Sequence, residues 1–218
     1  MIRLNIGCGP NMFPGWINSD RIDMSSYLDT LRHAGDIDTW PEHQKLIAAH
    51  ARDGRVSCIV RDIRDGLGEY ADGTVDAIYL GQIIEHWNPV YETPRFLGDM
   101  WRALRSGGRI RITTPDLDKL LTAYNCGQMD KFQAEQPEFY MTVTPDAQLS
   151  FLMFGATGPN CTRDNYEGHF MCYGRRAMRA LLEAVGFYWV DFETKSDIFA
   201  ECVDVGESHS MFVEAVKP

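Results

Sequence analysis

Short apolar runs alternate with longer amphipathic stretches along most of this chain. The short runs are rich in β-branched residues and end near a glycine, aspartate or proline, a pattern typical of strands. They predict strands at Ile2–Ile6, Ile17–Asp20, Val56–Val60, Val75–Leu80 and Arg109–Thr113. Helical periodicity appears between them, at Leu28–Leu31, Glu42–Ala51 and Pro94–Leu104. This alternation predicts a mostly parallel sheet covered on both faces, the doubly wound α/β class.

The C-terminal part continues the pattern with one change. Arg175–Val185 carries a clear helical stripe, and Gly186 stands where a C-terminal cap belongs. Tyr188–Thr194 and Met211–Val216 predict two strands, joined by a polar stretch without helical periodicity. Because no crossover helix separates them, we expect them to be antiparallel neighbours, which makes the last strand of the sheet antiparallel.

The segment 125–168 fits this pattern least well. It is long, contains glycines and aromatic residues, and carries an apolar island at Leu149–Phe154. Long irregular insertions in compact domains are usually lids or binding loops, so we expect this one to be a lid that binds the molecule on which the protein acts, here called the acceptor. Its aromatic residues and those that follow either wall an acceptor pocket or form a small satellite core: Phe139, Tyr140, Phe151, Phe154, Tyr166, Phe170 and Tyr173.

Length and composition restrict the class of protein. The 218 residues fit a single domain, 1–218, with an ordinary content of apolar and charged side chains. The net charge of −10 argues against a nucleic-acid partner. No apolar run is long enough to span a bilayer, and the first residues do not resemble a signal peptide. The six cysteines form no Cys-x-x-Cys pair, so we expect reduced thiols in a cytoplasmic protein. The oligomeric state stays open.

The strongest local motif is Gly7-Cys8-Gly9, directly after the first predicted strand. A strand that ends in Gly-x-Gly lets the backbone approach a ligand closely, although a tight turn has the same pattern. A dinucleotide-binding fingerprint needs a third glycine, and Met12 stands at that position. A nicotinamide-dependent oxidoreductase is therefore disfavoured. Little room remains for a full helix before Asp20.

Two aspartates follow predicted strands at the edge of the sheet where ligands bind. Asp20 ends the second strand and Asp62 follows the third. A carboxylate at the first position can accept hydrogen bonds from ribose hydroxyls, and one at the second can contact an adenine amino group. Asp20 could instead cap a helix and Asp62 could begin a turn. Asp23 and Asp65 are the neighbours that could replace them.

These motifs resemble the class I S-adenosylmethionine-dependent methyltransferases. The nearest group is a small bacterial type with a Gly-Cys-Gly loop and a Gly-Trp-x-Asn-x-Asp motif, often associated with glycan or secondary-metabolite modification. The matching segments are Leu4–Asn11, Gly15–Asp20, Val75–Tyr79, Ile84–His86, Leu104–Ile112, Thr114–Asp116 and His169–Phe187. The resemblance covers most of the chain and is weak across Met24–Arg55 and Asn125–Gly168. It implies a Rossmann-like methyltransferase fold with S-adenosyl-L-methionine as cofactor.

The resemblance also implies roles for single residues. Cofactor binding falls to Gly7, Cys8 and Gly9 at the methionine and ribose portion, Asp20 at the ribose, Asp62 and Ile63 beside the adenine, and Gly81 and Gln82 at the methionine moiety. Cys8 is expected to pack in the glycine loop rather than to act as a nucleophile.

Methyl transfer to a hydroxyl needs a group that takes the proton, typically His, Asp or Glu. His86 follows the fourth strand and His169 ends the insertion, so both are candidate bases. Asp116, after the fifth strand, is a third candidate that could orient the acceptor or an imidazole. Each has a structural alternative: His86 can hold the loop or the cofactor amine, and His169 can anchor the lid.

No metal-binding spacing is present, so the sequence predicts no metal site. Glu85, His86, Asp62 and Asp116 are the residues that could assemble one. We expect a methyltransferase that acts on an oxygen of a small polar molecule or saccharide. N-methylation of a small metabolite and non-catalytic S-adenosylmethionine binding are the alternatives.

Overall fold

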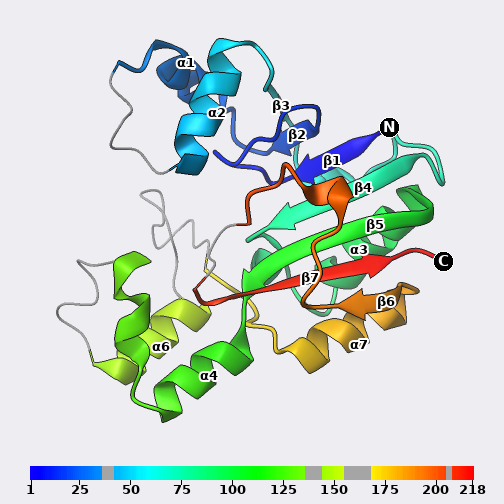
Figure 1. Ribbon diagram of the computed structural model, residues 1–218. Coiled ribbons are helices and arrows are strands. Elements are labelled where there is room, and N and C mark those ends of the chain that lie inside the picture. The colour runs from blue at the N-terminus through cyan, green and yellow to red at the C-terminus, as the bar shows by residue number, and fades with distance from the viewer. Residues whose placement is uncertain (36–41, 136–143, 155–167, 205–207) are drawn as a thin grey trace.

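The computed structural model describes residues 1–35, 42–135, 144–154, 168–204 and 208–218. The strands form one seven-stranded sheet in the order β3-β2-β1-β4-β5-β7-β6 (Figure 1). Their bounds are β1 Arg3–Ile6, β2 Ile17–Asp20, β3 Cys58–Val60, β4 Val75–Gly81, β5 Leu104–Pro115, β6 Tyr188–Asp191 and β7 Ser210–Val216. β1 to β5 are parallel, and β7 lies antiparallel between β5 and β6. The predicted mostly parallel sheet with an antiparallel last strand is confirmed.

The helices largely follow the predicted periodicity. Their bounds are α1 Ser25–His33, α2 Glu42–Arg52, α3 Glu92–Ala103, α4 Leu117–Asn125, α6 Pro145–Phe154 and α7 Arg175–Val185. Short 3-10 helices occur at η1 Ile63–Asp65, η2 Ile84–His86, η3 Met129–Glu135 and η4 Asp197–Phe199. Gly186 caps α7 with φ 114°, as the sequence predicts. No helix separates β1 from β2, in line with the short spacing there.

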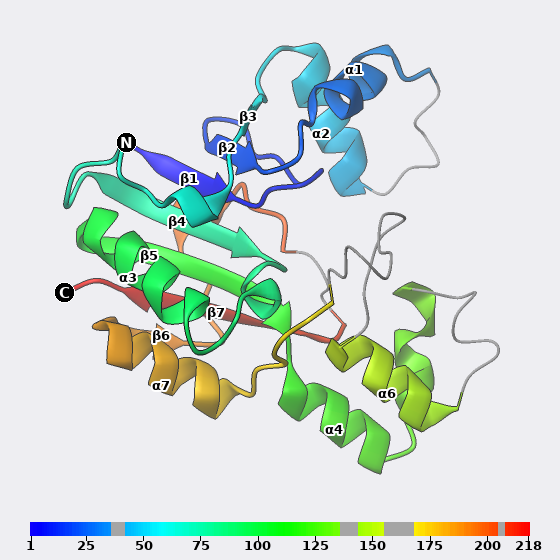
Figure 2. The ribbon, with the colours of Figure 1, turned by 180° about the vertical axis from the view of Figure 1, so that it is seen from behind.

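One face of the sheet is apolar and is covered by α3 and α7 (Figure 2). Alternate positions of β4 and β5, such as Ile78 and Ile110, point to this face and are fully buried. They pack with Leu97 and Met100 of α3 and with Leu182 of α7 in the main core of the protein. The apolar side chains on one face of the strands therefore pack against the apolar stripes of α3 and α7. This interface buries the largest apolar surface of the protein.

Irregular chain covers the other face of the sheet, where η4 crosses in front of the strands in Figure 1. Phe199 of η4 packs with Trp16 and Tyr79 in a separate aromatic cluster. Beside it, the guanidinium of Arg111 on β5 contacts the carboxylates of Asp204 at 2.7 Å and Glu214 at 3.0 Å. This face is held by hydrogen bonds and ion pairs as well as by apolar contacts.

A helix that the pattern did not predict, α4, leads from β5 into the inserted segment. α4 packs on η3 and α6 beyond the end of β5, and Leu120, Phe132 and Leu152 form a small core there. This small core contains none of the described aromatic residues considered for a pocket wall or a satellite core: Tyr173 lies in the main core, and Phe154 and Phe170 are exposed. Phe139, Tyr140 and Tyr166 lie outside the described residues. Among the described helices, none has the length and apolar character needed to cross a membrane.

Candidate functional site

A cleft of about 500 Å³ opens at the carboxyl ends of β1, β2 and β4. Its size is ordinary for a small-molecule site. The lining residues are Ile6, Gly7, Asp20, Arg21, Ile22, Arg61, Asp62, Ile63, Arg64, Gln82, Ile83, His86, Trp87, Glu92, Gly168 and Phe170. The carboxyl edge of a parallel sheet is where α/β folds bind their ligands, because loops that leave neighbouring strands diverge there.

The glycine loop after β1 forms one wall of this cleft. Gly7 has φ +63° and Gly9 has φ +47°, a region that side chains rarely adopt. A Cβ atom on Gly7 would also collide with the side chain of Ile83 across the cleft. Only glycine therefore permits this close approach. Cys8 is buried between them, and its Sγ lies 3.4 Å from Sγ of Cys58, so it faces β3 rather than the cleft.

Asn18 explains how the chain connects β1 to β2 without a helix. Its side-chain oxygen accepts hydrogen bonds from the Phe13 backbone N–H at 2.8 Å and from the amide of Asn5 at 2.9 Å. Its amide nitrogen donates to the backbone carbonyls of Phe13 and Ser57. This buried side chain satisfies loop groups that a helix would otherwise pair internally. It holds the glycine loop against β2.

Asp20 lies at the end of β2 and lines the cleft. Its Oδ2 accepts a hydrogen bond from the Gly9 backbone N–H at 2.8 Å, and its Oδ1 accepts one from the Ile22 N–H at 2.9 Å. A carboxylate has about four acceptor sites, so it can accept further bonds from a ligand. Asp20 caps no helix, because α1 begins only at Ser25. Asp23 accepts from the Ser25 N–H and is not part of the cleft lining.

Asp62 begins a turn, as its alternative role predicts, and it also lies in the cleft. Its carboxylate caps η1 by accepting the Arg64 backbone N–H at 2.9 Å, and the residue also lines the cleft. Ile63 lines the cleft beside it. Asp65, the alternative, does not appear in that lining.

The chain turns sharply where β4 ends. Gln82 has φ +55°, an uncommon conformation for a residue other than glycine, and its backbone N–H donates to the Thr113 carbonyl at 2.9 Å. Its side-chain amide donates to Ser210 Oγ at 2.9 Å, so the turn is tied to β5 and β7. Such strained positions persist where the surroundings fix them, often at functional sites. Gly81 lies outside the lining; a Cβ there would stand 2.8 Å from the Tyr79 ring.

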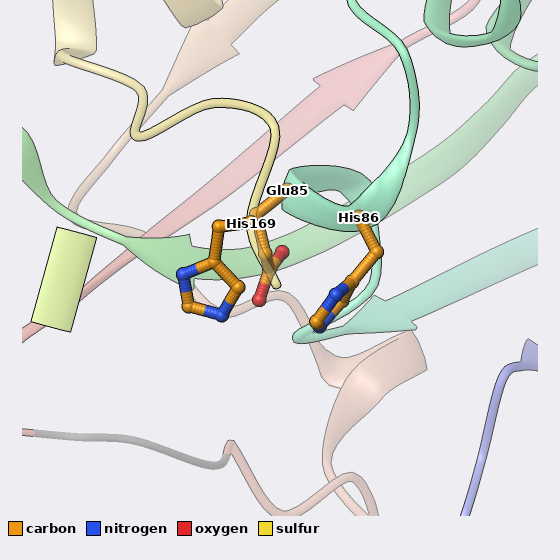
Figure 3. A group of neighbouring side chains, drawn as sticks. All are labelled: Glu85, His86 and His169. Atoms are coloured by element: carbon orange, nitrogen blue, oxygen red, sulfur yellow. The ribbon is translucent and has the colours of Figure 1, made fainter. Parts of the chain in front are cut away.

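Glu85, His86 and His169 lie close together beside the cleft (Figure 3), and of the three only His86 is among its lining residues. Glu85 and His86 come from η2, and His169 comes from the segment after the insertion. The two imidazole rings pack edge to face with centroids 4.9 Å apart. The Glu85 carboxyl is fully buried: its Oε2 accepts from Thr114 Oγ1 at 3.0 Å, and its Oε1 has no hydrogen-bond partner among the described residues.

Burial shifts the protonation of all three groups. It raises the pKa of Glu85 to about 8. It lowers the pKa of His169 to about 4, with a smaller contribution from the neighbouring His86, and it lowers the pKa of His86 as well. Both imidazoles are therefore neutral at pH 7, which leaves each with a nitrogen lone pair that can take a proton or bind a metal ion.

Asp116 lies outside both the cleft lining and the cluster of Glu85, His86 and His169. Its fully buried carboxylate caps α4 by accepting the Asp118 N–H at 2.9 Å and the Lys119 N–H at 3.3 Å. Arg175 is its cationic partner at 3.5 Å. Because these groups engage the carboxylate and the residue does not line the cleft, the geometry favours a capping role over catalysis. Asp62 and Asp116 also do not join Glu85 and His86, whereas His169 does.

Several residues that line the cleft carry no motif of their own in the sequence, and Phe170 was a candidate only as one of several aromatic residues. Arg21 and Ile22 directly follow Asp20, and Arg61 and Arg64 flank Asp62, so their proximity to the predicted aspartates was the available signal. Phe170 is 60% exposed at the mouth of the cleft, next to His169. Glu92 begins α3, and its carboxylate accepts the Asn88 N–H at 2.8 Å. Nothing in the sequence pattern distinguished it.

A family model described as a methyltransferase domain matches residues 4–112, half of the chain. The matched region includes the glycine loop, both cleft aspartates and η2. The chain belongs to the methyltransferase domain family. It is an S-adenosylmethionine-dependent methyltransferase, and the nicotinamide alternative is set aside. A search of curated proteins found no match.

Solved structures share the fold of this methyltransferase at low identity. A protein from Pyrococcus horikoshii has 15% identity and a TM-score of 0.51, with 99% of this chain and 81% of that chain covered. A possible exported protein from Bordetella parapertussis has 14% identity and a TM-score of 0.52, with 100% of this chain and 62% of that chain covered. The 1,6-didemethyltoxoflavin-N1-methyltransferase from Burkholderia thailandensis was solved with 1,6-didemethyltoxoflavin and S-adenosylhomocysteine. It has 13% identity and a TM-score of 0.50, with 99% of this chain and 70% of that chain covered.

The cleft fits the cofactor of this methyltransferase. The left-handed glycines leave the end of β1 without side chains, so a ligand can approach the backbone there. The Asp20 carboxylate lies beside this loop and can accept further hydrogen bonds beyond those from Gly9 and Ile22. The arrangement suits a ligand with a nucleoside portion and a flexible charged tail.

Proposed function

We propose that this methyltransferase transfers a methyl group to a hydroxyl oxygen of a small polar molecule or saccharide. The observation that carries the proposal is the pair of neutral imidazoles, His86 and His169, beside the cofactor cleft. A hydroxyl loses its proton as it is methylated, so it needs a proton-accepting group beside it. A neutral amine can attack first and release its proton afterwards, so it depends less on such a pair.

The cofactor residues are assigned as follows. The backbone of Gly7 lies along the methionine and ribose portion, and the N–H of Gly9 holds the Asp20 carboxylate beside it. The Asp20 carboxylate accepts hydrogen bonds from the ribose hydroxyls, and Asp62 with Ile63 flanks the adenine. Gln82 presents its backbone at the methionine moiety, because its side chain is bound to Ser210. S-adenosylmethionine, when bound, supplies a methyl group on a positively charged sulfur.

The residues of the chain position and activate the acceptor. Phe170 offers an exposed aromatic surface on which a sugar or planar ring can stack. The imidazole pair of His86 and His169 activates the acceptor hydroxyl. Holding the two reactants in line supplies much of the acceleration of a displacement reaction. Part of the inserted segment, 125–168, is proposed to close over the acceptor, which would keep water from the site.

Isothermal titration calorimetry with S-adenosylmethionine tests the cofactor assignment. Asp20→Ala should weaken binding by about 1.5–3 kcal/mol, the range for hydrogen bonds to a charged group. Asp23→Ala is the matched control, since Asp23 lies nearby but outside the cleft lining, and it should bind as the wild type does. Equal affinities of the two variants would contradict the role of Asp20.

Transfer of a radiolabelled methyl group to a panel of hydroxyl and amine acceptors tests the reaction. We expect product with polar hydroxyl compounds. His86→Ala and His169→Ala should lower turnover about 10²–10⁴-fold while cofactor binding persists. Methylation of amines alone would refute the proposal, and so would undiminished turnover in both variants.

A further inference from the structure

We propose that Glu85, His86 and His169 bind one divalent transition-metal ion of the zinc type beside the cleft. One ligand atom of each residue lies within 4.8 Å of the others. Figure 3 shows the carboxyl group of Glu85 close to both imidazole rings, which pack edge to face. The three side chains come from η2 and from a segment far along the chain, and the backbone N–H groups of Phe170 and Met171 join the two by donating to the Glu85 carbonyl.

The ligand set and its spacing suit such an ion. Two imidazole nitrogens and one carboxylate oxygen form the combination that zinc and related ions prefer, whereas magnesium and calcium take oxygen ligands. Zinc bonds of about 2.0–2.1 Å place tetrahedral ligand atoms about 3.4 Å apart, so modest side-chain rotations would close the site. Three protein ligands leave a coordination position open, as in catalytic rather than structural zinc sites.

The unpaired oxygen of Glu85 is an independent observation that points to a cation. Oε1 is buried without a hydrogen-bond partner, and no ion pair involves Glu85 in the described part of the chain. A buried carboxylate without compensation costs several kcal/mol, so such groups are normally paired or bound to metal.

Each ligand is oriented by a second hydrogen bond. His169 Nδ1 donates to the Met153 carbonyl at 3.2 Å, which leaves its Nε2 lone pair available. His86 is hydrogen-bonded to the backbone of Gly168. Thr114 Oγ1 donates to the other oxygen of Glu85 at 3.0 Å. Metal-binding histidines almost always donate their second N–H to a carbonyl or carboxylate, and ligating carboxylates are themselves hydrogen-bonded. The cluster has this pattern at all three positions.

The metal ion would give the proposed reaction its activating group, so this inference rests on the proposed function. The acceptor hydroxyl would occupy the open coordination position, and the ion would lower its pKa. The two imidazoles would then act on the hydroxyl through the ion that they bind, and the proton would pass to solvent water before the inserted segment closes over the acceptor. The ligand of the site is thus the cation together with one oxygen of the acceptor.

Titration of Co²⁺ into tag-free, chelator-treated full-length protein tests the site by visible absorption. We expect one equivalent to bind, with the d–d bands of nitrogen and oxygen ligation, and to be displaced by Zn²⁺. His169→Ala and Glu85→Gln should each weaken Co²⁺ binding about 100-fold, while His33→Ala, at an exposed histidine outside the cluster, should leave it unchanged. Circular dichroism confirms folding; if Glu85→Gln does not fold, the partly exposed His169 provides the decisive variant.

Three outcomes would overturn the site: no d–d bands, equal Co²⁺ affinity in His169→Ala and His33→Ala, or a thiolate charge-transfer band. The last would place the metal at Cys8 and Cys58 instead. Methyl transfer measured with and without chelator separates this inference from the proposed function. Co²⁺ bound at the cluster without hydroxyl methylation would refute the function and leave the site standing. Transfer undiminished by chelation, with no Co²⁺ bound, would refute the site and leave the function standing.

Discussion

The two faces of the sheet are built from the same strands and are stabilised differently. Along β5, Ile110 and Ile112 point to the face covered by α3 and α7, where the core is apolar. Arg111 lies between them in sequence and points to the opposite face, where its guanidinium donates to Asp204 and Glu214. Neighbouring residues on one strand thus belong to an apolar core and to a buried polar network.

The network face uses side-chain hydrogen bonds where the apolar face uses helices. Glu214 accepts bonds from Arg111, from the Ser196 backbone N–H and from Ser196 Oγ, which fixes the chain before η4. Asn18 does the same for the loop between β1 and β2. An apolar contact tolerates small displacements, whereas a buried charge depends on each partner. The two faces should therefore respond differently to substitution.

Arg111→Met should have the largest effect on stability. It removes the cation and leaves Glu214 buried without its main partner, which costs about 3–5 kcal/mol. Chemical denaturation followed by circular dichroism measures this loss. The double variant Arg111→Met with Glu214→Gln provides the sharper comparison, because it removes the uncompensated charge as well. It should recover a large part of the loss; if the double variant is as unstable as the sum of its single substitutions, the charge is not the cause.

Ile110→Ala tests the apolar face one position away on the same strand. It removes buried methyl groups from a fully packed core, which should cost about 3 kcal/mol. Ile110→Val should cost about 1 kcal/mol, because a smaller cavity remains. The same denaturation measurements apply. A graded response would confirm that this face is stabilised in proportion to buried area, whereas equal losses for both variants would contradict it.

The apolar face could be predicted from the sequence because its signals are local. The period of two in β4 and β5 and the helical stripe of α7 are visible in short windows, and they locate the sheet and its covering helices. The cover of the other face has no such period. Asn11 binds the Val203 carbonyl and Arg111 binds Asp204 across long stretches of chain, so only the folded structure shows these contacts.

The residues of the candidate site likewise fall into those that could be predicted from the sequence and those that could not. Asp20, Asp62 and Gln82 could be located because each follows a strand, and the carboxyl ends of parallel strands share one edge. Asp116 also follows a strand, yet its side chain turns to cap α4, a choice that depends on the helix the pattern did not predict. The meeting of His169 with Glu85 depends on the path of the chain around the insertion, which periodicity does not describe.

Asp76 lies on the rim of the sheet, outside both buried faces, and should give the smallest effect. Its carboxylate accepts hydrogen bonds from Arg105 and from the Ile2 N–H, both at 2.7 Å. The Arg105 hydrogen bond, followed by that of Ile2, holds the pKa of Asp76 below its ordinary value of 3.8 against the opposing effect of burial.

The folded-state pKa of Asp76 is thus depressed, so the stabilisation is complete above the unfolded pKa and is lost as the pH falls through the folded value. Asp76→Asn should cost about 1 kcal/mol at pH 7 and almost nothing at an acid pH below the folded pKa, where wild type is protonated too. Asp72→Asn is the control, because its pair with Arg102 is exposed and should matter little. Urea denaturation of the three proteins at both pH values measures the difference, and a cost for Asp76→Asn that is independent of pH would show that the charge on this rim contributes nothing.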